Sequence, residues 1–321
     1  MTVDQVKPQL VFVHGIGGSR DPEQELADWK GALAEGAADT HPAAAKFLDK
    51  SVSCSFACYA DLFATAGAQG GAPGGASAEE IEITRVLMVE LLDDVLELPD
   101  QSGNPLLRRC RTQLASGEGA QGVLNVVRVV SAAVTALLAV PGANLASRAL
   151  SRMELLGMLS QPGRYLHRGA PDATGLTLDQ RIRDRVHACL DPARPAVVVA
   201  HSLGTVVALE ALSEYPGRTA LFVTLGSPIT TRAFVWPLLR PRPPATPETV
   251  DDWADFRDGD DPVVPKRRLV KAIRPNGRGV QPVSQRMDSV VFFPHGAERY
   301  LRRREVAEPV LRTLTALAAW G

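Results

Sequence analysis

Short hydrophobic runs alternate with longer, more polar segments along this chain. Five runs have the length and apolar content of β-strands: residues 9–13, 51–59, 197–200, 253–257 and 289–293. Five other segments have the composition of helices: residues 24–36, 79–98, 176–190, 205–214 and 306–320. Strands that alternate with helices predict an α/β protein with a mostly parallel central sheet and helices on both faces.

The middle third of the chain has a different composition. Residues 64–78 are rich in glycine and alanine, which predicts a loop, and residues 106–157 predict two or three further helices. Residues 123–140 are strongly apolar but contain Asn125 and Arg128. The apolar stretch after Arg128 is shorter than the roughly 20 residues needed to cross a bilayer. We therefore favour a buried or lid helix over one that contacts a membrane.

The most informative pattern is Ala-His-Ser-Leu-Gly at residues 200–204, between a predicted strand and a predicted helix. Ser202 would lie at the tip of a sharp strand-to-helix turn, the nucleophile elbow, which exposes a serine hydroxyl. The strand and the helix approach each other closely at such a turn, which requires small residues on both sides of the serine. Ala200 and Gly204 are the small residues here, although the first position is usually glycine. His201 is expected to point away from the active face. Ordinary strand–helix turns can carry the same pattern, so it needs support from elsewhere.

A glycine-rich segment, His-Gly-Ile-Gly-Gly at residues 14–18, directly follows the first predicted strand. An enzyme that transfers acyl groups needs two backbone N–H groups to hold the oxyanion of its intermediate. Leu203, which follows the serine, would supply one, and Ile16 is the candidate for the second, with Gly15 as the alternative. His14 is interpreted as structural. A phosphate-binding loop is less favoured because the glycine spacings typical of nucleotide sites are absent.

The remaining two residues of such a site should follow the serine in the order acid, then histidine. His295 is the only histidine downstream of Ser202, and it follows a strand-like run. It is the candidate general base. The acidic segment 251–264 offers several carboxylates, of which Asp261 is preferred, with Asp260 and Asp258 as alternatives.

Together these motifs resemble the α/β-hydrolases of the serine esterase and lipase group. The matching pieces are residues 14–18, 200–204, 224–228, 261–263 and His295. The resemblance implies one α/β-hydrolase domain over residues 1–321, with residues 79–175 as a helical insertion or cap. It also implies an enzyme, a serine hydrolase that cleaves carboxylic esters, possible lipid esters included, without metal or organic cofactor.

The implied mechanism passes through an acyl-enzyme on Ser202, with His295 as base and Asp261 as its acid partner. Two alternatives stay open at this stage. A thioesterase, amidase or transacylase would use the same residues, because pocket shape and leaving group select the bond. A non-catalytic hydrolase fold that only binds its ligand is the second alternative.

Composition narrows the range of partners. The chain has 321 residues, 45% of them hydrophobic, which is enough to bury a large core. A formal net charge of -1 argues against a general nucleic-acid binder. The resemblance to esterases and lipases implies a small-molecule or lipid ester as partner. Arginines 302–304 fit the solvated face of a helix better than a membrane-binding patch. The first residues lack the pattern of a signal peptide, so a cytoplasmic location is expected.

Overall fold

The computed structural model describes both ends of the chain and part of its middle. The continuous described ranges are residues 7–17, 21–65, 101–116, 161–231, 235–259, 268–287 and 295–320. Shorter described pieces are residues 85–86, 88–89, 92–93, 96, 129, 132–133, 136, 261 and 264.

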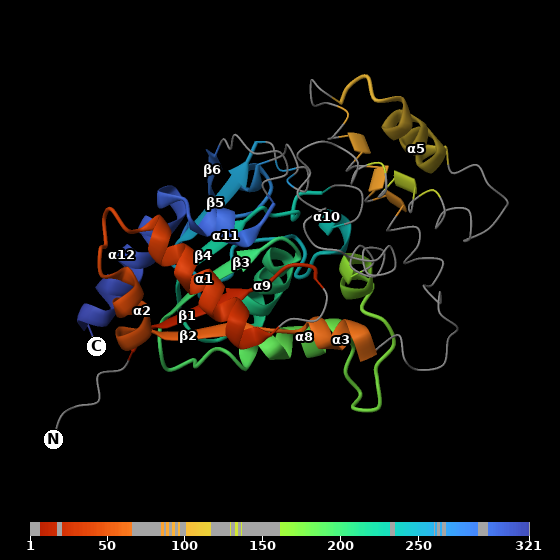
Figure 1. Cartoon of the computed structure of the whole chain (residues 1–321). Coiled ribbons are helices and arrows are strands. Elements are labelled where there is room, and N and C mark those ends of the chain that lie inside the picture. The colour runs from red at the N-terminus through yellow and green to blue at the C-terminus, as the bar shows by residue number, and fades with distance from the viewer. Residues whose placement is uncertain are drawn as a thin grey trace.

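Six strands form a single sheet in which all neighbouring strands are parallel (Figure 1). The strands are β1 (Gln9–Val13), β2 (Ser53–Ala57), β3 (Ala196–His201), β4 (Thr219–Leu225), β5 (Trp253–Asp258) and β6 (Val283–Met287). Their order across the sheet is β2-β1-β3-β4-β5-β6. The prediction of an α/β protein with a parallel sheet is therefore confirmed.

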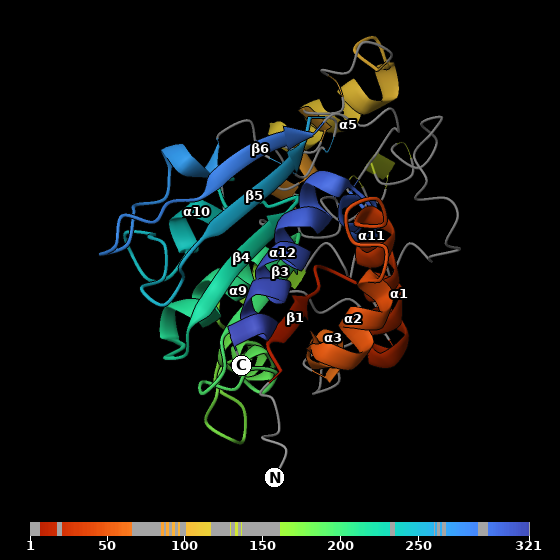
Figure 2. The same cartoon turned by 90° about the vertical axis from the view of Figure 1, so that its left-hand side faces the viewer.

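Helices cover both faces of this sheet. The described helices are α1 (Pro22–Gly36), α2 (Ala44–Ser51), α3 (Ala60–Thr65), α5 (Pro105–Ala115), α8 (Leu178–His187), α9 (Leu203–Glu214), α10 (Val235–Leu238), α11 (Ala297–Leu301) and α12 (Arg304–Trp320), with a short 3₁₀ helix, η2 (Leu269–Lys271). Helices from the two ends of the chain, α1 and α12, contact each other on one side of the sheet (Figures 1 and 2). Helices α8 and α9 pack together on the other side.

Alternation along the strands divides the interior into two cores. In β1, Val11 and Val13 face the core beneath α8 and α9, whereas Leu10 and Phe12 face the core beneath α1, α2 and α12. All five residues of β1 and all six of β3 are buried. A strand buried on both faces takes apolar residues at nearly every position, which explains the hydrophobic runs at residues 10–13 and 196–200. The polar residues Gln9 and His201 lie at the strand ends.

Two expectations about individual elements need correction or relocation. The last strand of the sheet is β6 (Val283–Met287), which the hydrophobic pattern did not predict, because an edge strand with four polar or exposed positions lacks an apolar run. The strand predicted at residues 289–293 lies outside the described residues. Proline-rich composition predicts a loop at residues 236–247, but the first residues of this segment belong to the helical turn α10 (Val235–Leu238).

Much of the middle third lies outside the described residues, including most of the predicted loop at 64–78. Every described residue between 85 and 96 is helical, in agreement with the predicted helix at 79–98. Within the apolar segment 123–140, Val129, Ala133 and Ala136 are helical and buried, whereas Ala132 is exposed. Among the described residues, no helix combines the length and the apolar content needed to cross a bilayer.

The strand order changes direction between β1 and β3. The chain moves from β1 to β2 on one side and later returns to β3 on the other side. In open α/β sheets such a reversal separates the loops that follow the two central strands, and ligands bind there. Helix α5 lies on the side of the molecule toward which the strand arrows point (Figures 1 and 2).

A buried carboxylate joins three strands of the sheet. Asp255 of β5 accepts hydrogen bonds from the hydroxyls of Thr224 in β4, at 2.8 Å, and Ser284 in β6, at 2.7 Å. The indole N–H of Trp253 donates to the Thr224 hydroxyl at 3.1 Å. Burial raises the pKa of Asp255 from 3.8 to about 6, and the two hydroxyl donors only partly oppose this effect.

The raised pKa of Asp255 predicts a pH-dependent stability. The folded protein holds this proton more tightly than the unfolded chain, so its stabilisation is full below pH 3.8 and is lost as the pH rises through about 6. Asp255→Asn removes the titration and should raise the free energy of unfolding at about pH 8, by up to ~3 kcal/mol. Urea unfolding of both proteins between about pH 4 and 8 measures this difference.

The exposed neighbour Asp252 provides the control, because Asp252→Asn should leave the pH dependence unchanged. A difference between Asp255→Asn and the wild type that stays constant with pH would contradict the prediction.

Candidate active site

Ser202 occupies a strained turn between β3 and α9. Its φ of 53° lies in the left-handed region, which residues other than glycine rarely adopt, and the residue is buried. A Cβ atom at Gly204 would lie 2.3 Å from the carbonyl oxygen of His14 and 2.5 Å from that of Val13. Only glycine fits there. The small residue that the sequence analysis assigned to the close approach of the elbow strand and its helix is thus also required by the end of β1. Leu203 begins α9, where a backbone N–H has no acceptor within the helix.

The glycine loop (residues 14–17) continues β1 and lies against the serine. A Cβ atom at Gly15 would be 2.6 Å from the Cβ of Ser202 and 3.1 Å from its Oγ. This loop therefore approaches the hydroxyl as closely as backbone atoms allow, and a side chain at residue 15 would displace it. Ile16 is partly buried and packs on the core beneath α8 and α9.

The His14 side chain fixes the orientation of the peptide group between Gly15 and Ile16. The backbone N–H of Tyr59 donates to Nε2 of His14 at 3.2 Å, so the ring proton lies on Nδ1. Nδ1 in turn donates to the carbonyl oxygen of Gly15 at 2.6 Å. The N–H of Ile16 points the opposite way from this carbonyl, because the two groups are antiparallel in a trans peptide. His14 is fully buried, and the Tyr59 ring stacks on it at 4.0 Å.

His295 bridges the serine and a buried acid. Its Nε2 lies 2.9 Å from Oγ of Ser202, and its Nδ1 lies 2.7 Å from Oδ2 of Asp261. The Asp261 side chain is completely buried, whereas the His295 side chain is one-fifth exposed. A carboxylate on Nδ1 fixes the tautomer in which Nε2 can accept the serine proton. The imidazole is thus placed for proton transfer from Ser202.

Tyr300 holds the acid from the opposite side. Its hydroxyl donates to Oδ2 of Asp261 at 2.7 Å and accepts the backbone N–H of Asp258 at 3.1 Å. Burial, reinforced by the Asp261 carboxylate, raises the pKa of Tyr300 well above its usual value, so the phenol keeps its proton. Oδ2 of Asp261 therefore accepts two hydrogen bonds, one from Tyr300 and one from His295.

Gly226, at the end of β4, forms the floor under the acid and the base. Its φ of 56° is left-handed, and a Cβ atom there would lie 2.9 Å from Oδ2 of Asp261 and 3.2 Å from Nδ1 of His295. The glycine is thus required twice, for its backbone conformation and for the space that the Asp261–His295 hydrogen bond occupies.

The expected orientation of His201 is wrong. Its ring lies against that of His295, with centroids 4.7 Å apart, and also neighbours Trp29 and Tyr300. The strained backbone at Ser202 separates the two side chains, but the fold returns His295 and its helix α11 over the face on which His201 lies. His201 therefore packs behind the base.

The structure brings together most of the residues that the sequence proposed. Ser202, His295 and Asp261 form one hydrogen-bonded line, with Leu203 adjoining it. Of the alternative acids, Asp258 offers its backbone N–H to Tyr300, and Asp260 lies outside the described residues. Tyr300 had no detectable signal in the sequence, because its role depends on the position of α11. Among the described parts of the chain, no group of three potential metal ligands occurs.

Comparison with protein-family models, with curated proteins and with solved structures finds no match for this chain. The chemistry of the site therefore has to be inferred from its own geometry.

The first prediction for the site concerns the floor at Gly226. Gly226→Ala should lower the reactivity of Ser202 toward a fluorophosphonate by at least about tenfold, because the methyl group pushes Asp261 away from His295. The rate of adduct formation, followed by intact mass, measures the effect.

Gly279→Ala is the matched control for this variant. Gly279 also has a left-handed φ, of 78°, but nothing lies within 4 Å of its Cβ position. This variant carries a similar backbone strain of about 1–2 kcal/mol without touching the site. Equal reactivity of the two variants would show that strain, not the contact with Asp261, causes any loss.

The second prediction concerns Tyr300. Tyr300→Phe removes one of the donors to Oδ2 of Asp261 and should lower the rate of serine labelling about tenfold, while the protein stays folded. Tyr215→Phe is a suitable control, since that buried hydroxyl has no hydrogen-bond partner among the described residues. Unchanged labelling in Tyr300→Phe would show that the Tyr300 hydroxyl is not needed to orient the acid.

Proposed function

We propose that this protein is a serine hydrolase with the α/β-hydrolase fold that cleaves carboxylic esters. The observation that carries the proposal is the hydrogen-bonded line from Asp261 through His295 to Ser202, with distances of 2.7 and 2.9 Å. A serine hydroxyl is a weak nucleophile until a positioned base accepts its proton. A buried serine, a partly exposed imidazole and a buried carboxylate in this geometry would activate the serine hydroxyl as a nucleophile.

The placement of the three residues along the fold supports the proposal. Ser202 follows the central strand β3, Asp261 follows β5, and His295 precedes α11, after the last strand. This is the chain order of α/β-hydrolases, which differs from that of other serine hydrolases. Since fold alone does not establish function, the argument depends on the residues and their distances.

In the first half of the proposed reaction, Oγ of Ser202 attacks the ester carbonyl carbon and transfers its proton to Nε2 of His295. The tetrahedral oxyanion collapses, the bond to the leaving oxygen breaks, and His295 donates the proton to the departing alcohol. Asp261 stabilises the imidazolium between these two transfers. The products of this half are the free alcohol and an acyl ester on Ser202.

In the second half, water replaces the alcohol. His295 accepts a proton from the water, whose oxygen attacks the acyl carbon, and then returns the proton to Oγ of Ser202. The acid leaves and the free serine is restored. These steps use side chains, backbone N–H groups and water, and require no metal or organic cofactor.

Two backbone N–H groups would stabilise the oxyanion in both halves. We assign Leu203, at the start of α9, and Ile16, in the glycine loop, to this role. The hydrogen bond from His14 to Gly15 supports Ile16, because it fixes the orientation of the peptide that carries the Ile16 N–H. The Gly15 N–H is less suited as an oxyanion donor, because the loop approaches Ser202 through the α-carbon of Gly15. Loss of one such donor lowers turnover by about 100- to 1,000-fold in related chemistry.

We further propose that residues 79–175 form a helical cap that shapes the acyl pocket. The position of α5, on the side where the strands end, supports this assignment (Figure 2). A cap of this kind would exclude water from the reaction and could select lipid esters by the length of their acyl chain.

Covalent labelling tests the proposal directly. A fluorophosphonate should add once to the wild type and not to Ser202→Ala, and hydrolysis of p-nitrophenyl esters should fall by at least about 10,000-fold in this variant. Ser213→Ala, in the same helix α9, is the control. Within the described part of the chain, the Ser213 hydroxyl donates to the backbone carbonyl of Leu209 and contacts no residue of the site. No adduct on folded wild-type protein would favour a non-catalytic binding module.

The same proteins can separate the bond types. One acyl group presented as an oxygen ester, a thioester and an anilide should be cleaved fastest as the oxygen ester. A faster thioester or anilide would assign the protein as a thioesterase or an amidase, and transfer to an added alcohol in preference to water would assign a transacylase.

A further inference from the structure

Gln161 connects the middle of the chain to the glycine loop. It begins a helical segment (residues 161–166) and is buried. Its Oε1 accepts the backbone N–H of Gly17 at 3.1 Å, and its Nε2 donates to the carbonyl oxygen of Gly17 at 2.7 Å. One side-chain amide thus binds both backbone groups of a single glycine.

This double contact restricts the orientation of two successive peptide planes. The Gly17 N–H belongs to the same plane as the Ile16 carbonyl, and the Gly17 carbonyl belongs to the next plane along the chain. The plane before Ile16 is already held by the hydrogen bond from His14 to Gly15. Ile16 therefore lies between two fixed planes, one set by His14 and the other by Gln161.

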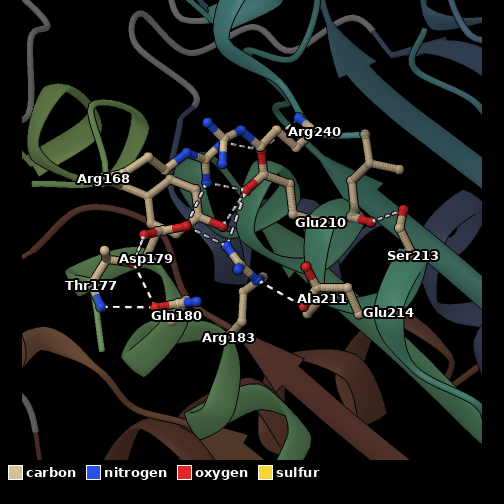
Figure 3. A network of polar contacts seen from close by, with 12 residues as sticks. Arg168, Thr177, Asp179, Gln180, Arg183, Glu210, Ala211, Ser213, Glu214 and Arg240 are labelled. Carbon is tan, nitrogen blue, oxygen red and sulfur yellow. Dashed lines mark hydrogen bonds and ion pairs between the residues drawn. The ribbon is translucent and has the colours of Figure 1, made fainter. Parts of the chain in front are cut away.

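The segment that carries Gln161 is itself anchored to α9. Tyr165 donates to Oε2 of Glu210 at 2.8 Å, and Arg168 binds both oxygens of Glu210, at 2.7 and 2.8 Å. Arg168 also donates to Asp179, which Arg183 binds at 2.6 Å (Figure 3). All five side chains are buried, so the charges compensate each other away from water.

Two features show how firmly this anchor holds. Arg168 has a left-handed φ of 69°, an unfavourable conformation that persists where surrounding contacts determine it. Its guanidinium also donates to the carbonyl of Leu238, and the backbone N–H of Arg240 donates to Glu210 at 2.9 Å. Figure 3 shows Arg168, Arg183 and Glu210 converging from three separate segments. Removing one member would leave a buried charge uncompensated.

Glu210 and Ser202 belong to one rigid unit, because α9 starts at Leu203 and contains Glu210 two turns later. A continuous set of contacts therefore runs from the nucleophile helix through Glu210 and Tyr165 to Gln161, and from there to Gly17. The glycine loop is thereby held relative to the helix that carries the serine.

We propose that Gln161 is a positioning residue that holds the glycine loop so that the Ile16 N–H can bind the oxyanion. The proposal rests on the proposed function, since it assigns the loop a role in hydrolysis. A donor that acts only on the transition state affects kcat more than KM. Gln161→Ala should lower kcat by about tenfold to a hundredfold and leave KM within about twofold.

Gln9 provides a matched control at the other end of β1. It is buried too, and its amide makes the same double contact with Asp191, through a donated bond of 3.0 Å and an accepted bond of 2.8 Å. Gln9→Ala should lower the thermal stability to a similar extent as Gln161→Ala and leave kcat unchanged. Equal losses of kcat in the two variants would overturn the proposal, because general destabilisation would explain both.

Gln161→Glu adds a readout that mere destabilisation would not reproduce. An ionised carboxylate can accept the Gly17 N–H with one oxygen, but its other oxygen then faces the Gly17 carbonyl, so that two acceptors oppose each other. The protonated acid can instead donate a hydrogen bond to this carbonyl. The ratio of kcat for Gln161→Glu to kcat for the wild type should therefore rise as the pH is lowered. A ratio that stays constant with pH would contradict a specific role for the Nε2 donor.

Hydrogen exchange at the Gly17 amide separates this inference from the proposed function. In protein labelled with ¹⁵N-glycine, the Gly17 N–H should exchange at least about tenfold faster in Gln161→Ala and at the wild-type rate in Gln9→Ala. Unchanged exchange in Gln161→Ala would refute the contact whether or not the protein is an enzyme. Faster exchange in Gln161→Ala, together with a wild type that hydrolyses no ester, would retain the contact and refute the hydrolase.

Discussion

The direct contact between the end of β1 and the first turn of α9 is the constraint on which the nucleophile and the glycine loop both depend. The carbonyl groups of Val13, the last residue of β1, and of His14 lie so close to Gly204 that no side chain fits there. The left-handed turn at Ser202 directly precedes this contact, and Gly15 lies against the serine hydroxyl. The nucleophile and the glycine loop are therefore positioned by the same backbone contact, before any other side chain takes part.

The acid and the base are held in a different way. Asp261 and His295 come from loops after other strands, and side-chain contacts, not backbone packing, determine where they meet. Tyr300 binds the acid, Gly226 leaves room for the pair, and the ring of His201 lies behind the imidazole. The position of the acid and the base therefore depends on several separate contacts. We expect substitutions at these contacts to differ more in their effect on activity than substitutions in the glycine loop.

The sequence predicted best those features that local geometry dictates. Continuous apolar runs identified β1 and β3, and small residues around Ser202 indicated the turn, because these requirements act within a few residues. The choice of Asp261 over its neighbours depends on the path of an acidic turn, which no local pattern encodes. Tyr300 and Gln161 could not be predicted, because each contacts a segment that is far away in the sequence. β6 was missed because an exposed edge strand has no apolar run.

The pairing order of the sheet also constrains how the chain can fold while it is being synthesised. β1 pairs with β2 early, but its other neighbour, β3, begins only at Ala196. Until the ribosome has delivered more than half of the chain, the apolar β1 keeps one edge of unpaired backbone groups, which invites association with other chains. Closing so long a connection also slows folding. Expression at low temperature or with chaperones should therefore affect the yield of this protein more than changes to its surface.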